Sequence, residues 1–188
     1  MFALSIVSSS SFIYQFIGIV ALVICVLSFQ IKNNKYFLLL QLVSCSLFAL
    51  QFFLGGSWAG FLLNCVCVFR CLAFAFVTKK RPRRILTVFI CLGFAAAGIV
   101  SYFVYKQNII LVLIATLASI VGAISIAFDN EKIIRYVQIA FVSPCWIAHN
   151  IFFLSIGGIV SEALNIVSAL IALLRWKKAD SKVEMTNK

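Results

Sequence analysis

The chain has 188 residues, of which 64% are hydrophobic and 11% are charged, and its mean hydropathy is +1.13. Soluble proteins carry about a quarter charged residues, so this composition excludes an ordinary soluble domain. The net charge of +11 would suit nucleic acid, but the basic residues lie at the ends of apolar runs, as in membrane proteins. Nucleic-acid binding is therefore not expected, and the lipid bilayer is the first partner that the composition predicts.

Apolar stretches of about 20 residues, each long enough to cross the hydrocarbon core, recur along the whole chain. The seven predicted spans are residues 12–31, 36–54, 59–77, 85–104, 109–128, 133–154 and 158–175. The connections are so short that consecutive spans must be antiparallel neighbours. The sequence therefore predicts an all-α integral membrane protein, with residues 1–188 forming one membrane domain.

Two further features of this layout are expected. The glycine pairs Gly55-Gly56 and Gly157-Gly158 should form tight turns before the third and seventh spans, because glycine adopts turn conformations without steric cost. Residues 177–188 are polar and should form a short disordered tail.

Basic residues fall almost entirely on one side of this predicted bundle. Apart from Lys106 on the N-terminal side and Arg70 inside a span, all of them fall on the other side: Lys32, Lys35, Lys79, Lys80, Arg81, Arg83, Arg84, Lys132, Arg135, Arg175, Lys177, Lys178, Lys182 and Lys188. Positive charge in short loops marks the cytoplasmic side. The N-terminus should thus be outside and the C-terminus in the cytoplasm.

Residues around the third span recur around the seventh at an offset of 101, pairing Gly56 with Gly157 and Asn64 with Asn165. Residues 12–77 and 109–175 therefore read as two three-helix repeats. The linking span at 85–104 restores the orientation, which makes the repeats parallel. Parallel repeats of this kind are found in SWEET transporters, with sites near the repeat interface. Chance similarity between two apolar segments is the alternative.

The segment from Cys145 to Trp176 resembles the YgjV family of bacterial inner-membrane proteins. Its distinctive residues are Trp146, His149, Asn150, Ser155, Ile156, Gly157, Gly158 and Glu162. The similarity in layout covers nearly the whole chain, and the family resembles PQ-loop, SWEET and PnuC-like transporters in plan. This resemblance implies the three-plus-one-plus-three fold more securely than any solute.

In the sugar-carrying relatives, an aromatic residue and an Asn of each repeat line the central pocket. The resemblance implies that Phe48 with Asn64, and His149 with Asn165, take these places, each pair sixteen residues apart. The chain departs from those relatives because only Pro144 lies within a span and no Pro-Gln motif occurs. Sugar transport by the SWEET rocking mechanism is not implied.

Polar side chains within spans usually face the bundle interior or a wet cavity. In the predicted spans they converge at one depth in the outer half of the membrane. The predicted solute-binding residues are Phe48, Asn64, Trp146, His149, Asn150, Glu162 and Asn165. As an alternative, Glu162 is stabilised by its helix dipole and His149 only bonds a neighbouring helix.

Arg70 is the only basic residue near the middle of a predicted span. Buried charges are usually paired, and Glu162 is the only acid inside a span. A structural ion pair between Arg70 and Glu162 therefore competes with a role for Arg70 in binding a substrate anion.

The seven cysteines all lie in apolar runs, and no metal-ligand spacing or nucleophile motif is present. Disulfides, a metal site, a cofactor and enzymatic activity are thus not expected. The sequence favours a permease for a small polar solute bound between the repeats. The alternative is a non-transporting scaffold or partner-binding subunit, and a homo-oligomer is left open.

Overall fold

A computed structural model of the chain describes residues 2–28, 34–77, 79–127 and 130–186, and every regular element in these ranges is helical. The elements are α1 (Phe2–Ser28), α2 (Asn34–Leu54), α3 (Trp58–Phe76), α4 (Lys80–Phe103), α5 (Ile109–Ala127), α6 (Glu131–Val137), the π-helix η1 (Gln138–Val142), α7 (Ser143–Phe152) and α8 (Ile156–Thr186). Lys32 and Lys188, two of the basic residues counted above, lie outside the described residues.

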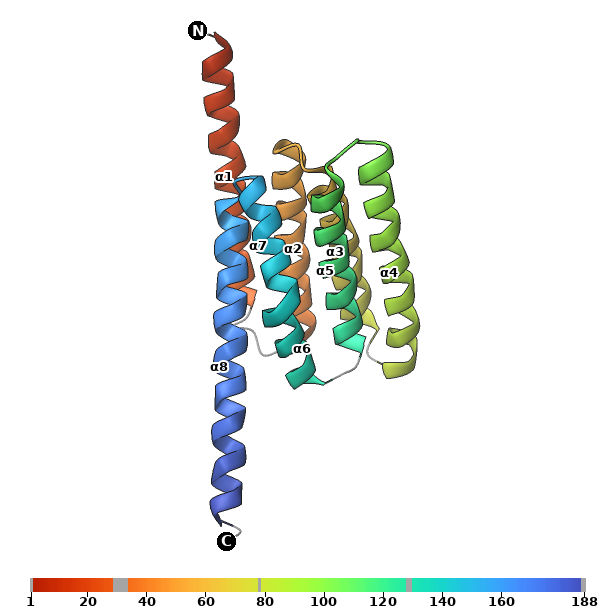
Figure 1. The fold of residues 1–188 in the computed structure, drawn as a ribbon, viewed down its shortest axis with the longest axis vertical. Helices are drawn as coiled ribbons and strands as arrows, with labels where there is room; N and C mark the ends of the chain where they lie inside the picture. Colours follow the sequence, from red (N-terminus) through yellow and green to blue (C-terminus); the bar gives the residue numbers. More distant parts are fainter. Residues whose placement is uncertain (1, 29–33, 78, 128–129, 187–188) are drawn as a thin grey trace.

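Because α6, η1 and α7 follow one another with helical backbone at each junction, the described residues form seven helical rods (Figure 1). The N- and C-termini lie at opposite ends of the bundle, as an odd number of antiparallel rods requires (Figure 1). The prediction of an all-helical chain with seven helices is thus confirmed. Within the described residues, four helical segments are long and apolar enough to cross a membrane: Lys35–Leu54, Trp58–Phe76, Arg81–Phe103 and Ile156–Leu174. Phe12–Ser28 and Ile109–Ser125 are shorter apolar helices.

The bundle has two chemically different ends. At one, which we call the turn end, the chain reverses between α2 and α3, between α4 and α5, and between α7 and α8 (Figure 1). At the other, the basic end, α3 is followed by α4 and α5 by α6. The basic residues described there are Lys35, Lys79, Arg81, Arg83, Arg84, Lys132 and Arg135.

The glycine pairs do not play equivalent roles, which corrects the sequence-based expectation. Gly55 and Gly56 lie in the α2–α3 turn, and Gly56 has a φ of +74°. Gly157 and Gly158 instead lie in the first turn of α8, and the positive φ of the α7–α8 turn, +51°, falls on Leu154. A Cβ atom on Gly157 would collide with the backbone of Gly18 in α1. This glycine therefore lets two helices approach closely, a common use of small residues in membrane bundles.

Two other predicted boundaries also change. The sixth span, expected as one helix, contains the π-helix η1 immediately before Ser143 and Pro144. Proline has no N–H to donate and crowds the preceding turn, and a π-helix widens the backbone at such a point. The helix α8 continues to Thr186, so the tail is helical up to that residue.

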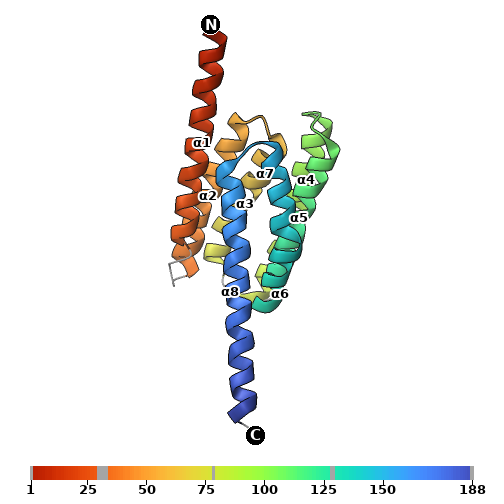
Figure 2. The ribbon, with the colours of Figure 1, turned by 60° about the vertical axis from the view of Figure 1, so that its left-hand side comes forward.

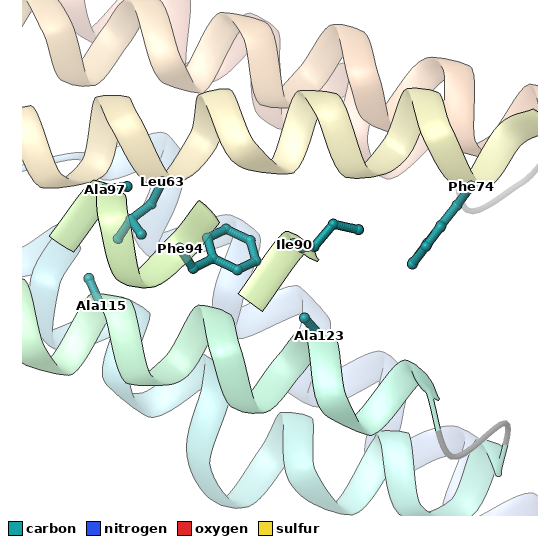
Figure 3. Close-up of a cluster of buried hydrophobic side chains, with 7 residues drawn as sticks. All are labelled: Leu63, Phe74, Ile90, Phe94, Ala97, Ala115 and Ala123. Carbon is teal, nitrogen blue, oxygen red and sulfur yellow. The ribbon is translucent and has the colours of Figure 1, made fainter. Parts of the chain in front are cut away.

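The helices pack in an order that leaves α4 at the edge of the bundle. Helix α1 packs against α2 and α8, α2 lies along α3, and α4 contacts α3 and α5 (Figures 1 and 2). A buried apolar cluster fills the space between α3, α4 and α5 (Figure 3). Its members are Leu63, Phe74, Ile90, Phe94, Ala97, Ala115 and Ala123. This cluster fixes α4 to the outside of the bundle and leaves the centre to polar side chains.

Candidate functional site

A cavity of about 630 Å³ lies in the centre of the bundle, with walls contributed by α1, α2, α3, α5, α6, η1, α7 and α8 and by the start of α4. Much of its wall is polar. The polar and sulfur-containing residues that line it are Cys25, Gln41, Ser44, Cys45, Asn64, Cys67, Arg70, Cys71, Arg83, Ser119, Ser125, Arg135, Gln138, Asn150, Ser161, Glu162, Asn165 and Ser168. Polar groups inside a membrane bundle cost free energy unless they face water, a ligand or one another.

Most of the predicted solute-binding residues meet on this wall. Phe48, Asn64, Trp146, Asn150, Glu162 and Asn165 all line the cavity. His149 does not, because its fully buried side chain lies closer to the turn end, among the rings of Phe52, Trp146 and Phe153. The structure thus places His149 against Trp146 but outside the described lining of the cavity.

Glu162 is held by a group of hydrogen-bond donors at the break between α6 and α7. The Ser143 hydroxyl donates to Glu162 Oε2 over 2.6 Å, and Asn165 Nδ2 donates to the same oxygen over 3.4 Å. Gln138 Nε2 donates to Ser143 Oγ over 2.8 Å and lies 3.5 Å from Glu162 Oε2. The π-helix therefore brings Gln138 and Ser143 onto one carboxylate. Sequence analysis missed both residues, although Pro144 marked the place.

Arg70 and Glu162 both line the cavity but form no ion pair in the described part of the chain, so the tie considered from the sequence is not made in this structure. The guanidinium of Arg70 instead lies beside the thiols of Cys45, Cys67 and Cys71, with Cys71 within hydrogen-bonding reach. Thiols are weak hydrogen-bond partners. Arg70 is thus a cation in the wall of the cavity, and the thiols described near it are weak hydrogen-bond acceptors.

The cavity extends toward one end of the bundle. Its lining reaches Arg83 at the start of α4, Ser125 near the end of α5 and Arg135 in α6, all at the basic end. Toward the turn end the lining stops at Phe52 and Gly158. The pocket was expected in the half of the bundle nearer the turn end. The structure shows it as the closed end of a longer cavity that extends to the basic end.

Four fully buried polar residues close the bundle above the cavity at the turn end: Gln51, Ser57, His149 and Ser155. Ser57 Oγ and His149 Nε2 are hydrogen-bonded over 3.1 Å. The Ser155 hydroxyl donates to Gln51 Oε1 over 3.2 Å. We call this pair of contacts the latch, because each joins α2 or its turn to α7 or its turn.

The two halves of the latch are related by a constant offset of 98 residues (155 − 57 and 149 − 51). Ser57 caps α3 by accepting the Gly60 N–H over 3.1 Å, and Ser155 accepts the Gly158 N–H over 3.2 Å. Backbone hydrogen bonds of the two turns recur at the same offset, as do the positive φ angles of Gly56 and Leu154. The two turns therefore correspond at an offset of 98, three residues less than the offset of 101 read from the sequence.

Two glutamines clamp these turns from outside. Gln15 in α1 donates to the Leu154 carbonyl over 2.6 Å and accepts the Ile156 N–H over 3.3 Å. Gln107, just before α5, donates to the Gly56 carbonyl over 2.8 Å and accepts the Ala59 N–H over 2.7 Å. Each amide satisfies a backbone acceptor and donor that the turn leaves free. The turn end is thus tied together by side chains that sequence analysis did not single out.

These features define an integral membrane protein in which apolar helices enclose a polar cavity. The family model for bacterial inner membrane proteins called Imp-YgjV matches residues 12–180. The chain belongs to this family, as its sequence indicated, and it is a bacterial inner membrane protein. No curated protein and no solved structure matches the chain.

Proposed function

We propose that this protein is a permease for a small polar solute, and that it works by alternating access. The observation that carries the proposal is a polar cavity of about 630 Å³ that reaches the basic end and is closed at the turn end by the latch. Sites for small molecules have cavities of about 300–1,000 Å³ with a few converging polar groups. A cavity accessible from one end only is what a transporter presents in one of its two states.

The offset of 98 supports a pair of parallel repeats, α1–α3 and α5–α8, with α4 as the linking helix. At this offset Phe48 corresponds to Trp146, and Asn64 corresponds to Glu162. All four residues line the cavity. Each half then contributes one aromatic and one polar side chain at matching positions, as in transporters with a SWEET-like plan, whose sites lie at the repeat interface.

The proposed orientation places the N-terminus outside and the basic end in the cytoplasm, because basic loops remain on the cytoplasmic side. Lys106 is the basic residue described at the turn end. In this orientation the structure represents an inward-facing state. The latch is then the closed outer gate.

The latch has the properties of a contact that opens. Its formation leaves Gln51 Nε2 and His149 Nδ1 buried without a hydrogen-bond partner. Each such group costs about 1–3 kcal/mol relative to a solvated one, so the closed gate is not the most favourable arrangement for these side chains. The π-helix η1 and Pro144 supply a flexible point at which α7 and the latch could move relative to α6.

The proposal is tested by ligand-dependent thermal stabilisation of the full-length protein in detergent. A panel of sugars, nucleosides, vitamins, amino acids and organic acids is screened against the wild type and the cavity variants Glu162→Gln and Asn165→Ala. A matched control is Ser46→Ala, since the Ser46 hydroxyl is on the exposed side of α2 and bonds only its own helix.

A solute that binds the folded state raises its apparent stability by mass action. We expect a compound that stabilises the wild type and Ser46→Ala but not the two cavity variants. If no compound acts while the variants fold normally, the permease proposal fails, and the cavity residues serve a scaffold or partner-binding protein instead.

A further inference from the structure

The charges on the cavity wall are unequal. Three guanidinium groups, those of Arg70, Arg83 and Arg135, line the cavity, and among the described residues that line it Glu162 is the one carboxylate. The carboxylate of Glu162 already accepts hydrogen bonds from uncharged side chains. The described part of the chain contains no ion pair for any of the three arginines. The wall therefore carries an excess of positive charge.

Two of these arginines have a simple topological explanation. Arg83 lies in the first turn of α4 and Arg135 in the last turn of the short helix α6, both at the basic end, where the inside-positive bias places cations. The guanidinium of Arg83 also lies 4.7 Å from the ring centre of Phe74, a cation–π contact. These two residues alone would not indicate a ligand.

Arg70 has no such explanation. It precedes the last residue of α3 by six positions, which places it about 9 Å inside the helix end at about 1.5 Å per residue. A charge at that depth is retained where it pairs with another charge or faces a wet site. Its described neighbours are the thiols of Cys45, Cys67 and Cys71, which do not match the five donors of a guanidinium. Because Arg70 lines the cavity, a strong acceptor can reach its guanidinium from there.

Resting on the proposed function, we propose that the solute is a small organic anion, whose carboxylate or phosphate group is bound by Arg70. The planar guanidinium presents parallel N–H donors that suit both groups. Arg83 and Arg135 raise the local concentration of anions at the mouth of the cavity, because clefts lined by one sign of charge attract the opposite sign. Phe48 and Trp146 offer aromatic faces to the apolar part of the solute.

The test compares acids with neutral counterparts, which are the amides of the carboxylic acids and the alcohol that lacks the phosphate group. The pairs are lactate and lactamide, succinate and succinamide, and glycerol phosphate and glycerol, each assayed for thermal stabilisation of the full-length protein in phosphatidylcholine nanodiscs. The variants are Arg70→Gln and Arg70→Lys, with Arg81→Gln as control, because Arg81 is exposed at the basic end and does not line the cavity.

We expect at least one acid, and not its neutral analogue, to stabilise the wild type and Arg81→Gln. Replacing Arg70 by Gln should weaken its binding by roughly tenfold to a hundredfold, the range for a lost hydrogen bond to a charged group. If Arg70→Gln does not fold, protection answers the same question in the wild type: the acid should slow maleimide modification of Cys71 and the amide should not. Equal protection by both would overturn the inference.

The remaining outcomes separate the anion from the permease. Binding of neutral compounds that Arg70→Gln retains would overturn the anion and keep the permease. No binding by either member of any pair, nor by any compound in the wider panel, would overturn both. A parallel arm uses nanodiscs containing phosphatidylglycerol. Stabilisation by this lipid alone, lost in Arg70→Gln, would assign the bound phosphate to a lipid headgroup and overturn transport of a soluble anion.

Discussion

At the turn end, buried polar side chains bond one another across the bundle, whereas at the basic end the polar side chains of the wall face an open cavity. The latch and the glutamine clamps bond both turns to neighbouring helices, and they leave Gln51 Nε2 and His149 Nδ1 without a partner. The cavity wall leaves Arg70 and Arg135 without a carboxylate partner in the described chain. The hydrogen bonds that cross the bundle at the turn end thus contrast with the cations of the cavity wall, for which the described chain supplies no carboxylate.

The largest expected effect is a difference in the accessibility of cysteines from the two sides of the membrane. Cys45 and Cys67 line the cavity, so the impermeant anionic reagent sulfonatoethyl methanethiosulfonate should modify them from the basic end and not from the turn end. Inside-out vesicles and intact spheroplasts present the two ends separately, and mass spectrometry reads each cysteine.

Cys65 is the internal control for that experiment, because it is exposed on the outside of α3 and does not line the cavity. In a bilayer it should react from neither side. Equal modification of Cys45 from both sides would show that the turn end is not sealed. Modification from the outer side alone would reverse the orientation but keep the seal.

The next effect is on the contact between α1 and α8. In Gly157→Ala the new Cβ would meet the backbone of Gly18, which cannot rotate away as a side chain can. The helices must separate, and we expect a loss of about 2 kcal/mol or more in the free energy of unfolding. Chemical denaturation in detergent measures it. Gly93→Ala is the control, because its Cβ would lie 3.4 Å from Val66 Cγ1, an ordinary contact distance. If both variants were as stable as the wild type, the close approach of α1 and α8 would be contradicted.

The reciprocal latch predicts that two distant serines behave alike. Ser57→Ala and Ser155→Ala each remove a latch hydrogen bond and a bond from the Gly60 or Gly158 N–H, and each should cost about 1–2 kcal/mol of stability. Both should also raise modification of cavity cysteines from the turn end. Ser101→Ala, which removes only a bond to the Ala97 carbonyl within α4, should leave accessibility unchanged. A change in accessibility for one serine variant and not the other would break the proposed symmetry of the gate.

The smallest effect concerns the conformations of the two turns. Leu154 has a φ of +51° at the position where the other turn has Gly56. A left-handed conformation costs a non-glycine residue about 1–2 kcal/mol. Glycine avoids this strain, but it loses more backbone entropy on folding, which offsets part of the gain. Leu154→Gly should therefore stabilise the protein by about 0.5 kcal/mol. Gly56→Ala should destabilise the protein, and chemical denaturation measures both variants. If Leu154→Gly destabilised the protein and Gly56→Ala stabilised it, the strain assigned to Leu154 would be contradicted.

The length and position of the helices could be predicted because a membrane span is set mainly by a run of apolar residues. The interruption of the sixth span could not, since Gln138–Val142 is as apolar as many continuous helices and Pro144 alone does not say whether a helix bends or widens. The offset of 98 between the two turns could not be read from the sequence for a related reason. Glycine can permit a turn or a close helix contact, and the sequence does not show that Gly56 does the first and Gly157 the second.

The site could be predicted where lipid makes polar residues costly. Asn64 and Glu162 were found in this way, and both line the cavity. His149 satisfied the same criterion, but an internal hydrogen bond to Ser57 serves a buried imidazole as well as a cavity does. Arg83 and Arg135 were read as topological charges, because the end of a helix does not show toward which side its residue points.

The clamp made by Gln15 has a consequence for biosynthesis. Gln15 is on α1. The backbone groups that it binds belong to Leu154 and Ile156, at the turn that leads into the last helix, α8. The close contact of Gly18 with Gly157 joins the same two helices. During synthesis α1 therefore enters the membrane with its polar amide unpartnered until almost the whole chain has followed. Assembly of the bundle is completed by its two ends meeting, so a chain truncated before α8 should be a substrate for membrane quality control rather than a partly working protein.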